Sequence, residues 1–137
     1  MEKIIHDFAI KLITDWTELI RKEGVHNLDS LSKDLLKLNN ATALEMLSAI
    51  LTKLDTCIVD SKSMRKDLGL RIKERGRSRE YLTCLGILKY NRSYYENSVI
   101  GGYCCPLDDV IDVHSYERIS PGLCADVVNR AAYVSMR

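Results

Sequence analysis

The chain has 137 residues, of which 46% are hydrophobic and 28% charged, and its formal net charge is +1. That length and apolar content suit a single folded domain with a hydrophobic core, which excludes a disordered or low-complexity chain. The near-zero net charge conceals one basic segment, because residues 62–92 carry ten Lys and Arg against three Asp and Glu.

The N-terminal residues 1–20 are apolar in places, but charged residues interrupt them every few positions. We therefore expect no signal peptide or membrane span, and a cytoplasmic protein with no membrane partner. The five cysteines are odd in number and form no Cys-x-x-Cys pair. Free thiols are expected rather than disulfides or a zinc site.

Residues 1–60 form the predicted N-terminal helical region. Over residues 4–20 the apolar side chains recur at three- and four-residue steps, which predicts an amphipathic helix with one buried stripe. The members of this stripe are Ile5, Phe8, Leu12, Trp16, Leu19 and Ile20. Gly24 is expected to end the helix.

Two further helices are predicted in the same region. One covers residues 28–38, with Asp29 or Ser30 as its N-cap. The next begins soon after, because Thr42 and Glu45 form a capping box ahead of a leucine repeat. Three apolar stripes predict a helical bundle, although the same stripes could instead form the docking face of a homodimer.

The middle of the chain changes character twice. Residues 61–80 are predicted to be a basic connector, at best partly helical, since Gly69 and Gly76 interrupt the pattern. Residues 81–106 then carry β-forming side chains on either side of Gly86. They predict a small antiparallel meander of three strands.

Residues 107–137 are predicted to be helical. Asp108 and Asp109 lie in the first turn of a short helix, where negative charge complements the helix dipole. Ser120 followed by Pro121 is typical of the start of another helix, with Ser as N-cap. The predicted fold class is therefore α+β.

Catalysis finds little support in the residues. His6, His26 and His114 have no Ser, Cys or carboxylate at a spacing that indicates a triad. Asp108 and Asp109 diverge on a helix, and the dipole explains them without a metal ion. We expect no catalytic residue, no metal, no cofactor and no small-molecule substrate, and hence no enzyme.

Nucleic acid is the partner that the basic segment favours. Seven side chains are the candidate DNA phosphate contacts: Arg71, Lys73, Arg75, Arg77, Arg79, Lys89 and Arg92. Tyr90, Tyr94 and Tyr95 lie beside them and either pack within the sheet or stack on bases. The plainer alternative is that the basic residues only solvate an exposed linker.

Several short patterns resemble one known family. They are the Thr-x-x-Gly and Arg-x-Tyr-Tyr patterns of residues 83–95, Gly101-Gly102-Tyr103, Leu107-Asp108-Asp109 and Tyr116-Glu117-Arg118-Ile119-Ser120-Pro121. These resemble the N-terminal region of insertion-sequence transposases of the ISLre-2 group, also known as the uncharacterised protein family UPF0236. The resemblance is specific over residues 75–135 and weak over the first sixty residues.

The resemblance implies a Thr-x-x-Gly hairpin, an Arg-x-Tyr-Tyr strand and a helical DNA-binding segment. In full-length transposases of this kind a second helix completes a helix-turn-helix, and a catalytic domain with metal-binding carboxylates follows. Residues 107–137 are then an incomplete helix-turn-helix, a truncated DNA-binding segment.

The expected function is that of a non-catalytic, transposase-like N-terminal fragment of a mobile element, which binds DNA mainly through phosphate contacts. Base specificity would be low, since phosphate contacts carry no sequence information. Two alternatives stay open. One is a helical protein-interaction module that dimerises through the N-terminal helices. The other is a decayed mobile-element remnant without activity in transposition or DNA recombination.

Overall fold

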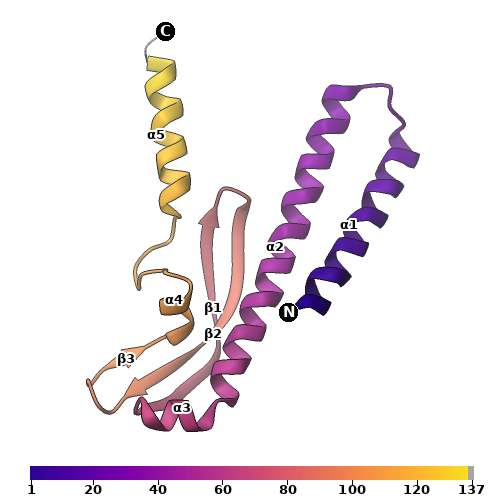
Figure 1. The fold of residues 1–137 in the computed structure, drawn as a ribbon. Coiled ribbons are helices and arrows are strands. Elements are labelled where there is room, and N and C mark those ends of the chain that lie inside the picture. The colour runs from indigo at the N-terminus through magenta and orange to yellow at the C-terminus, as the bar shows by residue number, and fades with distance from the viewer. Residues whose placement is uncertain (136–137) are drawn as a thin grey trace.

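The computed structural model describes residues 1–135, which form an α+β fold (Figure 1). Along the chain the elements are α1 (Glu2–Glu23), α2 (Leu28–Asp60), α3 (Lys62–Asp67), β1 (Leu70–Thr83), β2 (Gly86–Asn97), β3 (Tyr103–Cys104), α4 (Pro106–Val110) and α5 (Pro121–Ser135). The predicted fold class is confirmed: N-terminal helices precede a three-stranded antiparallel sheet in the order β1-β2-β3, and C-terminal helices follow it.

The N-terminal region contains two long helices, so the prediction of three was wrong. The predicted second and third helices are one helix, α2, of 33 residues. Thr42 is buried inside α2, and the real N-cap is Asn27, whose side chain accepts a hydrogen bond from the Ser30 backbone. Asn39 costs little helix propensity, and its Oδ1 accepts a hydrogen bond from Trp16 Nε1 at 2.7 Å. Contact with α1 thus supports an unbroken helix.

Helix α1 lies antiparallel to α2, which runs along one side of it (Figure 1). It ends at Gly24, as predicted, where φ is 67° and the backbone N–H bonds to the Ile20 carbonyl. Phe8 and Leu12 are partly buried, whereas Ile5 and Ile20 of the same predicted stripe are 46% and 42% exposed. No residue of α1 is fully buried. The apolar stripe is therefore wider than the surface that α2 covers.

The predicted basic connector over residues 61–80 is wrong, because most of it is strand. β1 begins at Leu70, and α3 occupies the residues before it. Gly76, taken as a break, sits at φ 67° where the pairing register shifts between Glu74 and Arg77. A bulge that needs a left-handed residue uses glycine without ending the strand.

The Thr-x-x-Gly pattern forms the turn between β1 and β2. Thr83 pairs with Gly86 across a two-residue loop, and Gly86 has a φ of 131° that favours glycine. Thr83 Oγ1 donates to the Gly86 carbonyl at 2.9 Å and accepts from the Leu85 N–H at 3.2 Å. The Thr83 hydroxyl therefore stabilises the turn through two backbone groups, and the Thr-x-x-Gly hairpin that the family resemblance implied is present.

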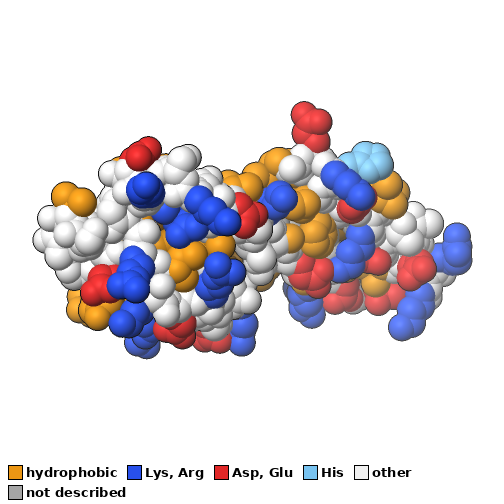
Figure 2. All heavy atoms as spheres, turned by 90° about the horizontal axis from the view of Figure 1, so that it is seen from below, with side chains coloured by type: hydrophobic (Ala, Val, Ile, Leu, Met, Phe, Trp, Pro, Cys, Tyr) orange, Lys and Arg blue, Asp and Glu red, His pale blue; other side chains and the backbone are white. Residues whose placement is uncertain are grey.

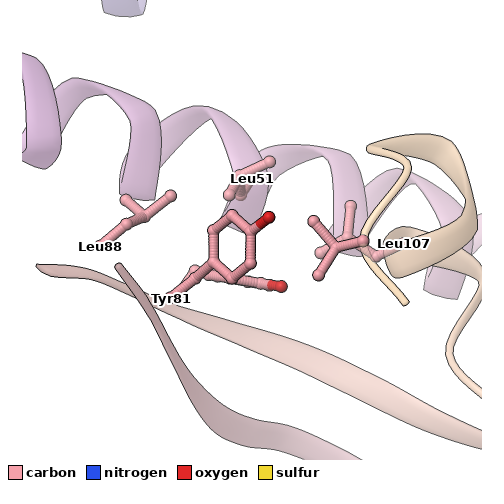
Figure 3. Packing of buried hydrophobic residues seen from close by; sticks show 6 residues of the cluster. Leu51, Tyr81, Leu88 and Leu107 are labelled. Atoms are coloured by element: carbon pink, nitrogen blue, oxygen red, sulfur yellow. The ribbon is translucent and has the colours of Figure 1, made fainter. Parts of the chain in front are cut away.

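The hydrophobic core lies between α2, the β1–β2 hairpin and α4 (Figure 3). Its buried members are Leu51, Tyr81, Leu88, Tyr90, Leu107 and Val113. A buried polar contact joins the same layers, since Asp55 of α2 accepts hydrogen bonds from Ser93 N at 2.8 Å and Ser93 Oγ at 2.6 Å. Helix and sheet are thus fixed by both apolar and polar contacts.

The segment between α4 and α5 adds one bridge to the outer edge of β1. Leu82 N donates to the Arg118 carbonyl, and Ser120 N donates to the Leu82 carbonyl, each at 2.8 Å. Ser120 Oγ also accepts from Leu123 N at 3.3 Å, which confirms the predicted helix cap. α5 then extends away from the rest of the molecule with no buried residue (Figure 1).

Within residues 1–135, none of the helices has the length and apolarity to cross a membrane.

Candidate nucleic-acid interface

The seven predicted phosphate contacts lie on β1 and β2, but they do not form one surface. Arg79 and Arg92 are turned inward, with side chains only 7% and 14% exposed. Lys89 is engaged by a carboxylate on the surface of the hairpin, and the rest lie on β1 between Arg71 and Arg77. We call Arg79 and Arg92 the buried arginine pair.

The buried arginine pair shares one carboxylate, that of Asp108 at the start of α4. Arg79 Nη1 donates to Asp108 Oδ2 at 2.7 Å, and the Arg92 guanidinium pairs with the same oxygen. Arg79 Nη2 further donates to the carbonyls of His114 at 2.7 Å and Glu117 at 2.6 Å. These bonds fasten α4 and the segment after it to the sheet.

Tyr90 completes the cluster by donating its hydroxyl to Asp108 Oδ1 at 3.1 Å. Burial raises the pKa of Tyr90, while the two guanidiniums oppose that shift. Asp108 is 5% exposed and therefore does more than complement the helix dipole, which was its only predicted role. Because a buried guanidinium cannot reach a phosphate, we remove Arg79 and Arg92 from the proposed contacts.

The remaining cations of β1 face the solvent. Arg71, Lys73 and Arg75 are exposed and make no ion pair within the described residues 1–135. The pairing register of β1 shifts between Ile72 and Glu74 and again between Glu74 and Arg77, so regular two-residue alternation does not place the three side chains on one face. All three nevertheless lie within one short stretch of the strand, and each is open to an approaching polyanion. We call these three residues the exposed basic strand.

Sequence reasoning missed the basic side chains of α3, which precede the exposed basic strand and pack against its start. They are Lys62, Arg65 and Lys66. All three belong to the basic segment 62–92, so the charge count was the signal that could have found them. Figure 2 shows Lys and Arg side chains spread over the end of the molecule that carries α3 and the sheet, with carboxylates between them.

Two of the predicted contacts are partly neutralised by neighbours. Lys89 Nζ lies 2.8 Å from Glu80 Oε1, and both side chains are more than half exposed. Arg77 lies 3.9 Å from a Glu74 oxygen, with its guanidinium carbon 5.1 Å from the ring centroid of Tyr94. Surface pairs of this kind contribute little to stability and exchange readily for another anion.

All three candidate tyrosines pack within the fold, which is one of the two roles that the sequence left open. Tyr90 and Tyr95 are 2% and 0% exposed, so they pack within the fold. Tyr94 stacks on Tyr103 of β3, with ring centroids 5.5 Å apart and planes 12° apart. That stack is reached from the solvent, since Tyr103 is 56% exposed.

The site holds no cluster suited to a metal ion. Among residues 1–135, no three His, Cys, Asp or Glu side chains converge, and the five cysteines are free thiols. Burial raises the pKa of both Cys104 and Cys105, which disfavours the reactive thiolate. The arrangement therefore offers exposed charge and aromatic surface.

Comparison with known proteins identifies the family. The uncharacterised protein family UPF0236 matches residues 21–137. The chain belongs to this family. Two curated relatives, both described as UPF0236 proteins of Caldanaerobacter subterraneus subsp. tengcongensis, are 26% and 27% identical to it over 125 residues. The alignments cover 91% of this chain and 26% of each relative, so the chain spans about a quarter of the length of these relatives. No solved structure matches it.

Proposed function

We propose that this UPF0236 chain binds DNA through phosphate contacts made by the exposed basic strand and by α3. The observation that carries the proposal is the exposed basic strand itself, whose three cations face the solvent and make no ion pair among the described residues. β1 is an edge strand of the sheet, and the bridge to its outer edge lies at Leu82, at the end of the strand away from the exposed basic strand. α3, which contacts β1, adds the exposed Lys62 and Lys66 directly before this strand, whereas Arg65 is partly buried.

The physical basis is the release of condensed counterions. A cation that neutralises a DNA phosphate frees a bound counterion, and this entropy gain favours binding most strongly at low salt. In this proposal the cations contact phosphates, which carry no sequence information. The chain therefore binds many DNA sequences with similar affinity.

Protection of a sheet edge is the plainer reason for basic residues on an outer strand, because charges there prevent pairing with another chain. Here α3 contributes Lys62, Arg65 and Lys66 directly before the strand, outside any sheet edge. The larger cationic surface favours a ligand.

A transposase-like identity extends this proposal. It is supported by family membership and by the Thr-x-x-Gly and Arg-x-Tyr-Tyr patterns, on which the resemblance to insertion-sequence transposases depends. The relatives are about four times as long as the matched part, which leaves room in them for a catalytic domain. In this proposal residues 1–135 position DNA and carry no catalytic group.

A salt series tests the DNA proposal. Fluorescence anisotropy with a labelled duplex should show log affinity falling linearly with log salt. The triple variant Arg71→Gln, Lys73→Gln, Arg75→Gln should reduce that slope by up to about 2.7, since each phosphate contact accounts for about 0.9.

A matched control removes the same charge elsewhere: Lys3→Gln, Lys22→Gln, Lys53→Gln, which lie exposed on α1 and α2. This control should leave the slope nearly unchanged. Equal effects of the two triple variants would show that net charge, rather than the exposed basic strand, governs binding. Absence of binding at low salt would refute the proposal.

The second candidate function is self-association through α1, which a separate observation favours. Ile5, Ile13 and Ile20 are 46%, 62% and 42% exposed along one flank of the helix. Light scattering should then give twice the monomer mass, and Ile5→Lys with Ile13→Lys should restore the monomer. A monomer that also fails to bind DNA would leave the decayed remnant as the better account.

A further inference from the structure

A groove of about 440 Å³ lies beside the tyrosine stack. Tyr94, Tyr103 and Arg77 line it, and the segment around Ser115 and Tyr116 lies on its other side. Its volume falls within the range of about 300–1,000 Å³ that small-molecule sites occupy. The groove is more polar than apolar in its lining side chains, so its ligand must offer hydrogen-bonding groups as well as a flat apolar face.

The aromatic part of the groove is already ordered. Tyr94 and Tyr103 are nearly parallel, at 12°, and Arg77 lies against the Tyr94 ring with its guanidinium carbon 5.1 Å from the ring centroid. Tyr103 keeps 56% of its surface exposed. A planar ligand can extend the stack on Tyr103 without moving either ring, so little conformational entropy is lost on binding.

The charged groups around the groove differ in how free they are to contact a ligand. The Asp108 carboxylate is occupied by the buried arginine pair and Tyr90, so it does not repel an anion as a free carboxylate would. The Arg77 side chain is half exposed, with Glu74 3.9 Å away. Asp109 is the exposed carboxylate of the lining and can accept hydrogen bonds from amino groups.

We propose that this groove binds an unpaired nucleotide of a nucleic-acid strand, with its base stacked on Tyr103 and the phosphate of a neighbouring nucleotide paired with Arg77. The inference rests on the proposed DNA binding and adds a preference for a single-stranded end or junction. A base inside a duplex has both faces covered by its neighbours, whereas an unpaired base can stack on an aromatic ring. Asp109 then meets the edge of the base, where exocyclic amino groups donate.

The position of Arg77 connects the groove to the exposed basic strand. Arg75 and Arg77 are on the same strand on either side of the Gly76 bulge. A backbone held by Arg71, Lys73 and Arg75 can therefore continue to Arg77 and deliver the next nucleotide to Tyr103.

The test compares a blunt duplex with the same duplex carrying a single-stranded tail that contains the fluorescent base 2-aminopurine. Stacking of one base on an aromatic ring is worth about 1–3 kcal/mol, which corresponds to about 5- to 150-fold in affinity. The tailed duplex should bind at least about fivefold tighter, and the 2-aminopurine fluorescence should be quenched. Tyr103→Ala should remove both effects and leave the blunt duplex unaffected, whereas Tyr103→Phe should keep them.

The outcomes separate this inference from the proposed function. If the tailed and blunt duplexes bind equally and the fluorescence is unchanged, the groove proposal is overturned while DNA binding stands. If Tyr103→Ala weakens both duplexes to the same extent and melts like the unaltered protein, the ring serves duplex binding and the groove proposal is also overturned. If neither duplex binds at low salt, both proposals fail.

Discussion

The buried arginine pair and the exposed basic strand contain the same kinds of side chain within one short stretch, yet they behave in opposite ways. Arg75 is exposed, whereas Arg79, four residues later on the same strand, is 8% exposed and fully engaged. The difference arises from Asp108, which reaches Arg79 from 29 residues away. A buried guanidinium next to a carboxylate is part of the fold, while a solvated one is free to meet another molecule.

This contrast shows that a count of basic residues overstates the positive surface. Of the ten Lys and Arg in residues 62–92, the buried arginine pair contributes to the interior. Lys89 is balanced by Glu80. What an anion meets is the smaller group from α3 to Arg77.

Removing the shared carboxylate should give the largest effect. Asp108→Ala leaves two buried guanidiniums without their counter-charge, and we expect a loss of about 3–5 kcal/mol in the free energy of unfolding. Urea denaturation measures it. Asp109→Ala, one position along α4 and exposed, should change stability by no more than about 0.5 kcal/mol.

If Asp108→Ala proves too unstable to purify, Asp108→Asn offers a milder test. It keeps an acceptor for Arg79 and removes the charge, so its loss should fall between those of the two alanine variants. Equal stability of Asp108→Ala and Asp109→Ala would contradict the role given to the buried cluster.

A second buried carboxylate provides a comparison without any cation. Asp55→Ala leaves both Ser93 donors unsatisfied in the interior, which should cost about 1–3 kcal/mol. The control is Asp60→Ala, exposed at the end of the same helix. Urea midpoints of the two variants should differ clearly, and similar midpoints would show that the Asp55 contact is dispensable.

Alkaline pH should weaken the buried cluster through Tyr90. Burial raises the folded-state pKa of Tyr90 above its ordinary value, so the stability from its neutral form is complete below the unfolded pKa of about 10. It is lost as pH rises through the folded pKa. The Tyr90→Phe variant should have a free energy of unfolding about 1 kcal/mol lower at neutral pH. As the pH rises into the alkaline range, its stability should decline less steeply than that of the unaltered protein. Stability measured against pH for both proteins checks this.

The smallest effect on stability should come from the exposed basic strand. Arg75→Gln should change the free energy of unfolding by less than about 0.5 kcal/mol, because the side chain has no partner among residues 1–135 whose loss would matter. It should nevertheless lower the salt slope of DNA binding by about 1. If Arg75→Gln instead caused a large loss of stability and left the salt slope of DNA binding unchanged, Arg75 would be a structural residue rather than a DNA contact.

The sequence predicted those features that depend on a few neighbouring residues. Gly24 ends α1, the residues Thr83 and Gly86 form the hairpin turn, and Ser120 caps α5. Each depends on a local backbone geometry that only certain residue types support. The α+β class followed from the same local patterns.

What the sequence did not predict depends on contacts between distant segments. The continuity of α2 is supported by a hydrogen bond between Trp16 and Asn39, and Gly76 marks a bulge only because β2 pairs on both sides of it. The burial of Arg79 depends on where α4 comes to lie. The charge and spacing of residues along the chain do not determine where α4 packs, so the ion pair between Arg79 and Asp108 could not be predicted from them.

Ser120 fixes the start of α5 to the sheet. One residue pairs with Leu82 through its backbone and caps the helix through its hydroxyl, so the direction in which α5 leaves is set by β1. Because these bonds fix the base of α5 to the sheet, spin labels near Leu123 should report a narrow distance distribution to the sheet, and labels farther along the helix, near Val127, a broader one. Ser120→Ala removes the capping hydroxyl, so it should broaden both distance distributions.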